Sequence, residues 1–289
     1  MKILITGANG LLGCYLTKSL ASLGEISPLS HDQMDITDRK AVFETIKQVR
    51  PDIIVHAAAI TDVEKCEQVP EIAWSRNYLG TVNLVDVAAL YGMRFVYISS
   101  TGCYGVGKKD KPYSEFDLVE PTTVHHKTKF EAEMVVSEHL SRYLIIRIGW
   151  LFGGSREHEK NFVWKRYLEA KDVNKVYSDP SQKGTPTYAG DVAHQLRVLL
   201  ENDCNGLFNC VDVGAASRLD YVREILKAFG LDCEVAPAPG GMFNRIAPVA
   251  TNESAVNVKL DMLGLSVMRP WREALAGYVN ELMRGKGNA

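Results

Sequence analysis

Three glycines near the start of the chain have the spacing of a phosphate-binding turn. Residues 6–13 read Thr-Gly-Ala-Asn-Gly-Leu-Leu-Gly and directly follow the apolar run 2–5. Gly7 can take the positive φ of a tight turn, Gly10 lets the backbone approach a phosphate, and Gly13 allows a helix to pack closely on a strand. A helix that begins just after this turn directs its free N–H groups and its dipole at the anion. The motif therefore predicts a dinucleotide site.

The elements that must position this turn alternate along the first half of the chain. Apolar strand-like runs occupy residues 3–6, 26–29, 52–56, 94–99 and 144–148, and segments with helical periodicity occupy 11–23, 38–49, 71–91 and 128–140. This alternation predicts βαβ units and a doubly wound, parallel Rossmann-type α/β sheet. Because the glycine turn lies between the first strand and the first helix, a cofactor site is favoured over an ordinary strand–turn–helix corner.

The second half of the chain has a looser pattern. Glycine, proline and short apolar pieces dominate beyond Gly153, and helices are expected at 190–201, 218–229 and 271–283. We expect residues 1–153 to form the dinucleotide-binding domain. Residues 154–289 are expected to form a smaller C-terminal substrate-binding region that partly returns to the sheet, because ligands of open α/β sheets bind outside the carboxyl ends of the strands.

The composition restricts the class of protein. The 289 residues are 46% hydrophobic and 24% charged, with a formal net charge of -2, which is typical of a globular protein and argues against a nucleic-acid partner. No apolar stretch approaches the roughly 20 residues of a membrane span, and the first apolar segment ends at a glycine turn rather than in a signal peptide. A cytoplasmic location with no membrane partner is expected. The six cysteines show no paired metal spacing, so reduced thiols and no metal site are expected.

Further segments at the ends of the expected strands carry a more specific signal. They are His56-Ala57-Ala58-Ala59, the run 77–83, Ser99-Ser100-Thr101-Gly102-Cys103-Tyr104-Gly105, and residues 121–129, followed toward the C-terminus by 147–150, 184–187 with Asp191, and 269–275. In order, spacing and content they resemble an extended short-chain dehydrogenase/reductase, and within that family the dTDP-4-dehydrorhamnose reductase branch. The resemblance covers nearly the whole chain.

The resemblance implies NAD(P)H-dependent reduction of a nucleotide-linked 4-keto-6-deoxy sugar and allows a homodimer. It makes Thr101 the catalytic hydroxyl at the C4 carbonyl, and makes Lys129 the residue that binds the nicotinamide ribose and lowers the pKa of the proton donor. Thr101, Gly102 and Trp150 are implied on the sugar side. The implied cofactor residues are Gly7, Gly10, Leu11, Leu12 and Gly13 at the pyrophosphate, Asp35 and Ile36 near the adenine, Ala57, Ala58 and Ala59 along the nicotinamide-side ribose, Lys129, and Asn77, which holds the helix geometry or a water behind them.

The main departure from the family pattern is at the position of the catalytic tyrosine. The Tyr-x-x-x-Lys motif of the family falls on His125-His126-Lys127-Thr128-Lys129, so His125 occupies the place of the catalytic tyrosine. An imidazolium can donate a proton to an alkoxide, and the unperturbed pKa of histidine is near 6.5. Reduction is then expected to rise as the pH falls through the pKa of His125. A bridging water, Tyr104 or Tyr113 are alternative sources of the proton.

The expected end of the second strand bears on the choice of cofactor. It reads Leu29-Ser30-His31, with no carboxylate to bind a ribose 2′-hydroxyl. A 2′-phosphate is then tolerated, so NADP(H) is favoured and NAD(H) is the alternative.

Two other functions stay open at this point. Loss of the tyrosine is compatible with a catalytically silent NADP-binding regulatory protein, as in the regulatory β subunit of methionine adenosyltransferase, which resembles the same family. The segment 99–105 also resembles that of nucleotide-sugar epimerases and dehydratases, which retain their cofactor.

Overall fold

A parallel sheet of six strands forms the centre of the molecule, which is described here from a computed structural model covering residues 1–106 and 110–285. Its order is β10-β5-β4-β3-β1-β2, and all neighbouring strands run parallel. The strands are β1 (Lys2–Thr6), β2 (Glu25–Leu29), β3 (Ile53–His56), β4 (Arg94–Ser100), β5 (Tyr143–Ile148) and β10 (Gly206–Cys210). The predicted doubly wound Rossmann-type sheet is confirmed.

The order in which successive strands are added to the sheet reverses between β1 and β3. From β1 it moves outward to β2 and then returns past β1 to β3, so the carboxyl ends of β1 and β3 flank a topological switch point. Open α/β sheets bind their ligands at such a point. The predicted glycine turn follows β1 and the predicted alanine run 57–59 follows β3, so both lie at this crevice.

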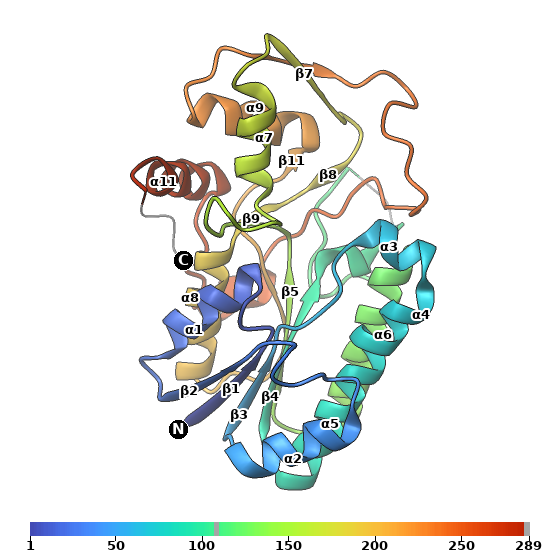
Figure 1. Cartoon of the computed structure of the whole chain (residues 1–289), viewed down its shortest axis with the longest axis vertical. Coiled ribbons are helices and arrows are strands. Elements are labelled where there is room, and N and C mark those ends of the chain that lie inside the picture. The colour runs from blue at the N-terminus through green and yellow to red at the C-terminus, as the bar shows by residue number, and fades with distance from the viewer. Residues whose placement is uncertain (107–109, 286–289) are drawn as a thin grey trace.

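Helices cover both faces of the sheet (Figure 1). On one face lie α1 (Leu11–Leu20) and α8 (Ala189–Glu201), and on the other α2 (Arg39–Val49), α5 (Gly80–Tyr91) and α6 (Val124–His139). A hydrophobic core lies on each face of the sheet. Successive side chains of β1 alternate between them: Ile3 and Ile5 belong to one core, and Leu4 belongs to the other. Such two-sided burial explains why the strands read as nearly continuous apolar runs.

The helix expected over 71–91 is interrupted. The chain forms α4 (Pro70–Ala73), then the π-helix η1 (Trp74–Leu79), and then α5, whose amide at Gly80 bonds back to Ser75. π-Helical turns are rare and often mark functional sites. The buried side chain within η1 is Asn77.

The helix expected at residues 128–140 begins earlier than predicted. Thr123 caps α6, and its hydroxyl accepts the amide of His126, so the helix starts at Val124. An N-cap threonine satisfies one of the free amides of the first turn, which makes the earlier start favourable. His125 and His126 therefore stand on the first turn of α6.

The remaining elements form the region above the carboxyl ends of the strands (Figure 1). Three small sheets pair β6 (Trp150–Phe152) with β9 (Pro186–Tyr188), β7 (Lys175–Ser178) with β12 (Glu234–Pro237), and β8 (Lys183–Gly184) with β11 (Ala216–Ser217). The helices of this region are α7 (Phe162–Ala170), α9 (Arg218–Ala228) and α11 (Trp271–Met283), while α3 (Val63–Gln68) contacts α6 and α10 (Val258–Leu263) contacts β10. Across the described residues, no helix combines the length and apolarity needed to cross a membrane.

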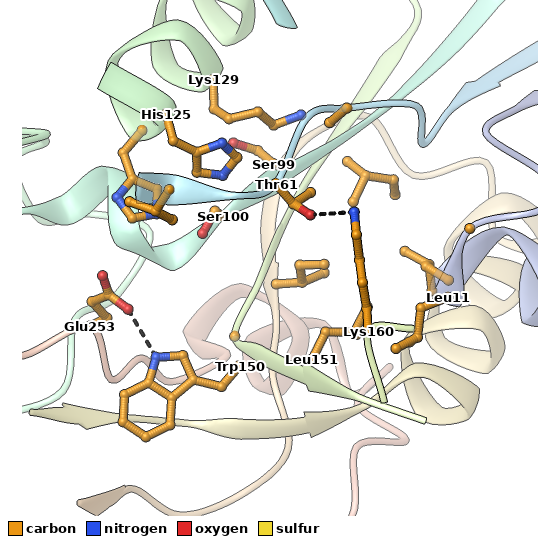
Figure 2. Close-up of a pocket in the computed structure, with 18 of the residues that line it drawn as sticks. Leu11, Thr61, Ser99, Ser100, His125, Lys129, Trp150, Leu151, Lys160 and Glu253 are labelled. Carbon is orange, nitrogen blue, oxygen red and sulfur yellow. Dashed lines mark hydrogen bonds between the residues drawn. The ribbon is translucent and has the colours of Figure 1, made fainter. Parts of the chain in front are cut away.

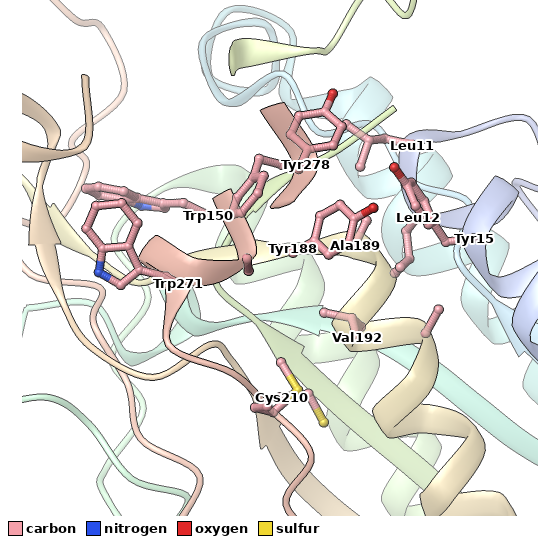
Figure 3. Close-up of a cluster of buried hydrophobic side chains, with 14 of the residues drawn as sticks. Leu11, Leu12, Tyr15, Trp150, Tyr188, Ala189, Val192, Cys210, Trp271 and Tyr278 are labelled. Atoms are coloured by element: carbon pink, nitrogen blue, oxygen red, sulfur yellow. The ribbon is translucent and has the colours of Figure 1, made fainter. Parts of the chain in front are cut away.

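Aromatic side chains fix this region to the first helix of the sheet domain (Figure 3). The ring of Tyr188 lies 5.5 Å from the rings of both Tyr15 on α1 and Tyr278 on α11. The Tyr15 hydroxyl accepts the amide of Gly154, and the Tyr278 hydroxyl donates to the carbonyl of the same residue at 2.7 Å. The segment that follows β6 is thus held at a fixed distance from the glycine turn.

Candidate active site

The glycine turn has the backbone geometry that a pyrophosphate requires. Gly7 has a φ of 69°, and a Cβ at this position would lie 2.7 Å from the amide nitrogen of Ala58. Gly10 is the N-cap of α1 without a side-chain cap, and the first turn of that helix holds no acidic residue. The first amides of α1 are consequently free to bind an anion. Gly13 packs directly on the carbonyl of Gly7, which fits its predicted role.

Two cavities border this turn. The first has a volume of about 380 Å³ and the second about 340 Å³, and both are lined by Gly10, Ala57 and Ala59. Leu11, Leu12 and Gly13 line the first, while Gly7 and Ala58 line the second. Because they share these three residues, the two cavities adjoin at the switch point, beside the amides of α1.

The second cavity lies where the adenosine half is expected. Asp35 and Ile36 both line it, together with Ser30, His31 and Arg76. The Asp35 carboxylate accepts bonds from the amide and the hydroxyl of Thr37, at 2.9 and 2.8 Å, and the first of these lowers its pKa. Asp35 thus shapes the loop as well as lining the cavity.

The first cavity brings together the two charged or titratable candidates of α6 (Figure 2). His125 and Lys129 both line it, one helical turn apart. Burial lowers the pKa of Lys129 to about 8, and its ammonium group lies 4.0 Å from the centre of the Tyr97 ring. Burial, together with the charges of His126 and Lys129, holds the pKa of His125 well below its usual range. His125 is therefore a neutral imidazole at neutral pH.

Asn77 organises this part of the site from behind the cavity. Its carboxamide oxygen accepts the amide of Ile60 at 2.9 Å, and its nitrogen donates to the carbonyl of the same residue at 3.1 Å. The nitrogen also lies 3.3 Å from the hydroxyl of Thr128 and 3.5 Å from Nδ1 of His125. The ring of His125 also interacts with the backbone of Ile60, so Asn77 and Ile60 together fix its orientation. Asn77 lines neither of the two cavities.

The end of β4 presents Ser100, rather than Thr101, to the cavity. Thr101 is 1% exposed in the 3₁₀ turn η2 (Thr101–Tyr104) and is not among the lining residues, whereas Ser99 and Ser100 are. The Ser100 oxygen accepts the amide of Gly102 at 3.2 Å, so its hydroxyl proton is free to be donated. Ser100 is the last residue of the strand, and this position is the signal that could have identified it.

Gly102, predicted on the sugar side, lies behind the cavity wall. Its α-carbon faces the imidazole of His126, which a side chain at this position would overlap. The two tyrosines that were alternative sources of the proton, Tyr104 and Tyr113, lie outside the cavity. The hydroxyl of Tyr104 donates to Asn209 at 2.9 Å and that of Tyr113 to the carbonyl of Gly105 at 3.2 Å, and neither residue lines the cavity.

The far end of the first cavity is lined by residues that no sequence motif identified. Trp150 stands there as predicted, and the guanidinium of Arg218 lies 3.5 Å from the centre of its ring. The indole nitrogen donates to Glu253 at 2.9 Å (Figure 2). Gln182, Arg218, Arg245 and Glu253 also line the cavity, as does Lys160, whose ammonium group donates to the hydroxyl of Thr61 at 2.8 Å, away from Trp150 (Figure 2). They come from separate loops and helices of the C-terminal region, so their spacing in the sequence carries no signal.

A buried ion pair supports the wall behind the site. Arg147 on β5 donates two hydrogen bonds to the carboxylate of Glu133 on α6, at 3.0 and 2.6 Å, and both side chains are under 5% exposed. The guanidinium also lies 4.7 Å from the centre of the Tyr104 ring. The pair thereby joins α6, which carries His125 and Lys129, to the sheet and to the turn after β4.

The chain is similar to several characterised proteins along its length. It is 30% identical to a dTDP-4-dehydrorhamnose reductase of Mycolicibacterium smegmatis, over 96% of this chain and 85% of that protein. It is 29% identical to the spore coat polysaccharide biosynthesis protein SpsK of Bacillus subtilis, over 97% of each.

Solved structures give the same result for the fold. A dTDP-4-dehydrorhamnose reductase from Clostridium acetobutylicum matches with a TM-score of 0.93 and 32% identity, over 98% of this chain and all of that one. One from Bacillus anthracis, solved in complex with NADP, matches with a TM-score of 0.91 and 27% identity, over 97% and 99% of the two chains. A UDP-glucose 4-epimerase from Thermus thermophilus, at 22% identity and a TM-score of 0.86 over 99% of both chains, shares the fold.

The model of one family, described as the RmlD substrate binding domain, matches residues 1–284. This match spans the glycine turn, both cavities and the C-terminal elements that close the second half of the site. The resemblance to dTDP-4-dehydrorhamnose reductases drawn from the sequence is thereby confirmed, and the chain belongs to the RmlD substrate-binding domain family.

Proposed function

We propose that this protein reduces the C4 keto group of a nucleotide-linked 4-keto-6-deoxy sugar with a reduced nicotinamide cofactor. The observation that carries the proposal is that one cavity is lined both by the glycine turn and by Trp150, with the guanidinium of Arg218 stacked on the indole ring. The names of the relatives over most of the chain support the same reaction. The residues of the cradle fit the cofactor because the glycine backbone and the free amides of α1 accept a pyrophosphate.

The charges at the far end of the cavity support a nucleotide-linked substrate. Arg218 is stacked on Trp150, and no carboxylate lies within ion-pair distance of it in residues 1–106 and 110–285. Arg245 and Lys160 line the same cavity. Cations that line a cavity attract an anion such as a diphosphate. The proposal places substrate binding mainly in residues 154–289 and cofactor binding in residues 1–153.

The residues of the first cavity suit reduction of a carbonyl. When bound, the cofactor supplies a hydride to the C4 carbon, and the electrons of the C=O bond move to the oxygen. In our proposal Ser100 takes the role that the resemblance implied for Thr101, because it has a hydroxyl proton free to bond the carbonyl oxygen. His125 lines the same cavity as a neutral imidazole, and Lys129 adds positive potential.

The proton that converts the alkoxide to a hydroxyl is proposed to come from Lys129. A neutral His125 holds no proton at neutral pH that it can give up readily. Lys129 is an ammonium group with a pKa of about 8, close to the range in which proton transfer is efficient. After donation, directly or through a water, the resulting amine regains its proton from solvent.

The pH dependence of the reaction follows from these two groups. The ammonium form of Lys129 is present below its pKa of about 8 and is lost above it, so we expect kcat to fall as the pH rises through about 8. We expect no rise in kcat between pH 7 and pH 6, because His125 stays neutral there. Steady-state rates from pH 5.5 to 9.5 measure both effects. If kcat instead rose as the pH fell through 6.5, and if His125→Gln abolished this rise, His125 would be the proton donor.

The preference for NADP(H) over NAD(H) is also proposed. No carboxylate follows β2 at positions 30 and 31, and Ser30, His31 and Arg76 line the adenosine cavity instead. A 2′-phosphate is compatible with these side chains, since an arginine near this position accommodates that group. The NADP in the Bacillus anthracis structure supports the same choice.

A carboxylate placed after β2 should reverse this preference. In Ser30→Asp the new charge repels a 2′-phosphate and can accept a bond from a 2′-hydroxyl, so we expect KM for NADPH to rise at least 10-fold and KM for NADH to fall. Ser22→Asp, on an exposed loop outside both cavities, is the matched control. Equal affinity of the native protein for NADPH and NADH would contradict the proposed preference.

The proposed function itself is tested by mixing the purified protein with dTDP-4-keto-6-deoxy sugars and NADPH. Loss of the reduced-nicotinamide absorbance, with formation of a 6-deoxy sugar product, is the expected result. Cofactor binding without turnover on any of these sugars would favour a catalytically silent protein. Release of tightly held NAD⁺ on denaturation would favour an epimerase or dehydratase.

A further inference from the structure

Glu253 presents a buried carboxylate oxygen that no group in the described part of the chain satisfies. The side chain is 6% exposed and lines the first cavity. One oxygen accepts the indole N–H of Trp150, and the other, Oε1, has no hydrogen-bond partner among residues 1–106 and 110–285. In Figure 2 this second oxygen points away from Trp150. Because an unsatisfied buried carboxylate is costly, this oxygen is suited to receive a donor from a molecule in the cavity.

The surrounding charges indicate the kind of donor. The other charged residues that line the cavity are all cationic, namely Lys129, Lys160, Arg218 and Arg245. Arg218 interacts electrostatically with Glu253 but forms no ion pair with it, and its position over the Trp150 ring is fixed by stacking. A cavity with this excess of positive charge repels an ammonium group. The donor that fits Oε1 is therefore a neutral hydroxyl.

We propose that Glu253 is a specificity-determining residue whose free carboxylate oxygen accepts a hydrogen bond from a ring hydroxyl of the sugar bound beside Trp150. The assignment rests on the proposed function, because it takes the sugar of a nucleotide-linked substrate as the ligand. It deepens that function by naming the group that is read: a hydroxyl at C2 or C3, the two ring positions that keep one in a 4-keto-6-deoxy sugar. A site that hydrogen-bonds a hydroxyl rejects analogues lacking it, since its own polar group is then left unpaired.

Binding of deoxy analogues tests the assignment without requiring turnover. Titration calorimetry is carried out with a dTDP-linked 6-deoxyhexose and with its 2-deoxy and 3-deoxy analogues, on the native protein and on its variants. We expect the native protein to bind one of the two analogues about 10- to 100-fold more weakly than the parent. In Glu253→Met the acceptor is lost, and we expect the affinities for that analogue and the parent to agree within about 3-fold. Glu253→Gln should show an intermediate ratio.

Two further variants separate recognition from structural support. Trp150→Phe removes the indole N–H but leaves the carboxylate, so the preference for the hydroxyl should persist even if overall affinity falls. Glu273→Met, on the exposed face of α11, is the matched control and should behave as the native protein. If Glu253 only held Trp150 in place, Glu253→Met would keep the native ratio between parent and analogue, which would overturn the assignment.

The outcomes also distinguish this inference from the proposed function. Hydroxyl-dependent binding that Glu253→Met abolishes, without any reduction of keto sugars, would reject the proposed reaction and keep the role of Glu253. Reduction of keto sugars with no effect of either deoxy change would reject Glu253 alone. Absence of binding to every dTDP-sugar would overturn both.

Discussion

Lys129→Met should lower kcat/KM for the keto sugar by about 10³-fold, a loss within the range for removal of a positioned acid. The substitution keeps the length of an unbranched side chain while it removes both the positive potential in the cavity and the proposed proton. Because Lys129 is buried and its pKa is lowered by that burial, its charge costs free energy in the folded state. We therefore expect the midpoint of thermal unfolding to stay the same or rise.

Lys127→Met provides the control for this variant. Lys127 lies on the same helix, two positions earlier, and its side chain is exposed. Its replacement should leave kcat/KM within 2-fold of the native value. Fluorescence titration with NADPH adds a second measurement, because loss of the ribose contact weakens binding while the cradle at the glycine turn remains. An active Lys129→Met protein would show that the proton comes from elsewhere and would remove Lys129 from the mechanism.

Glu133→Gln should destabilise the folded protein by about 3–5 kcal/mol. The substitution preserves the shape of the side chain but leaves the guanidinium of Arg147 without its counter-charge, in a place that is 3–4% exposed. Breaking one partner of a buried ion pair has a cost of this size because the remaining charge is desolvated and unpaired. The shift in the urea midpoint at unchanged slope measures it.

Two further variants show whether burial of the ion pair causes the loss of stability in Glu133→Gln. Glu169→Gln breaks an ion pair on the surface, in which the side chain of Glu169 is 43% exposed and that of Arg166 is 28% exposed. This substitution should lower the free energy of unfolding by less than about 1 kcal/mol. The double variant Glu133→Met with Arg147→Met removes both buried charges and should recover most of the lost stability. A loss below 1 kcal/mol in Glu133→Gln would contradict the assigned role of this pair.

The candidate cofactor half of the site could be proposed from the sequence because its signal is local. The glycine spacing, the apolar strand before it and the alanines after β3 each follow from the backbone path at the switch point, and the glycines and alanines line the two cavities. The choice between Ser100 and Thr101 was not predictable in this way. Neighbouring hydroxyls look equivalent in a sequence, and only the 3₁₀ turn after β4 decides which one faces the cavity.

Most residues of the proposed sugar half of the site could not be predicted from the sequence. Trp150 follows the predicted strand β5 and was found, whereas Arg218 and Glu253 reach the same cavity from remote elements. Their meeting depends on the packing of the small sheets of the C-terminal region, which contain strands of only two to four residues. Strands so short leave little periodic pattern. The lowered pKa of His125 was likewise set by burial, which the motif alone does not give.

The π-helix η1 restricts how this chain can change in length. A π turn closes over five residues rather than four, so it holds one residue more than an uninterrupted α-helix needs. Deleting a single residue from 74–79 would let the segment from Pro70 to Tyr91 continue as a regular helix with better local hydrogen bonds. The same deletion would rotate the part before it by about 100° relative to α5. Asn77 would then leave Ile60 and His125, so the chain retains a locally less favourable helix in exchange for the direction of one carboxamide.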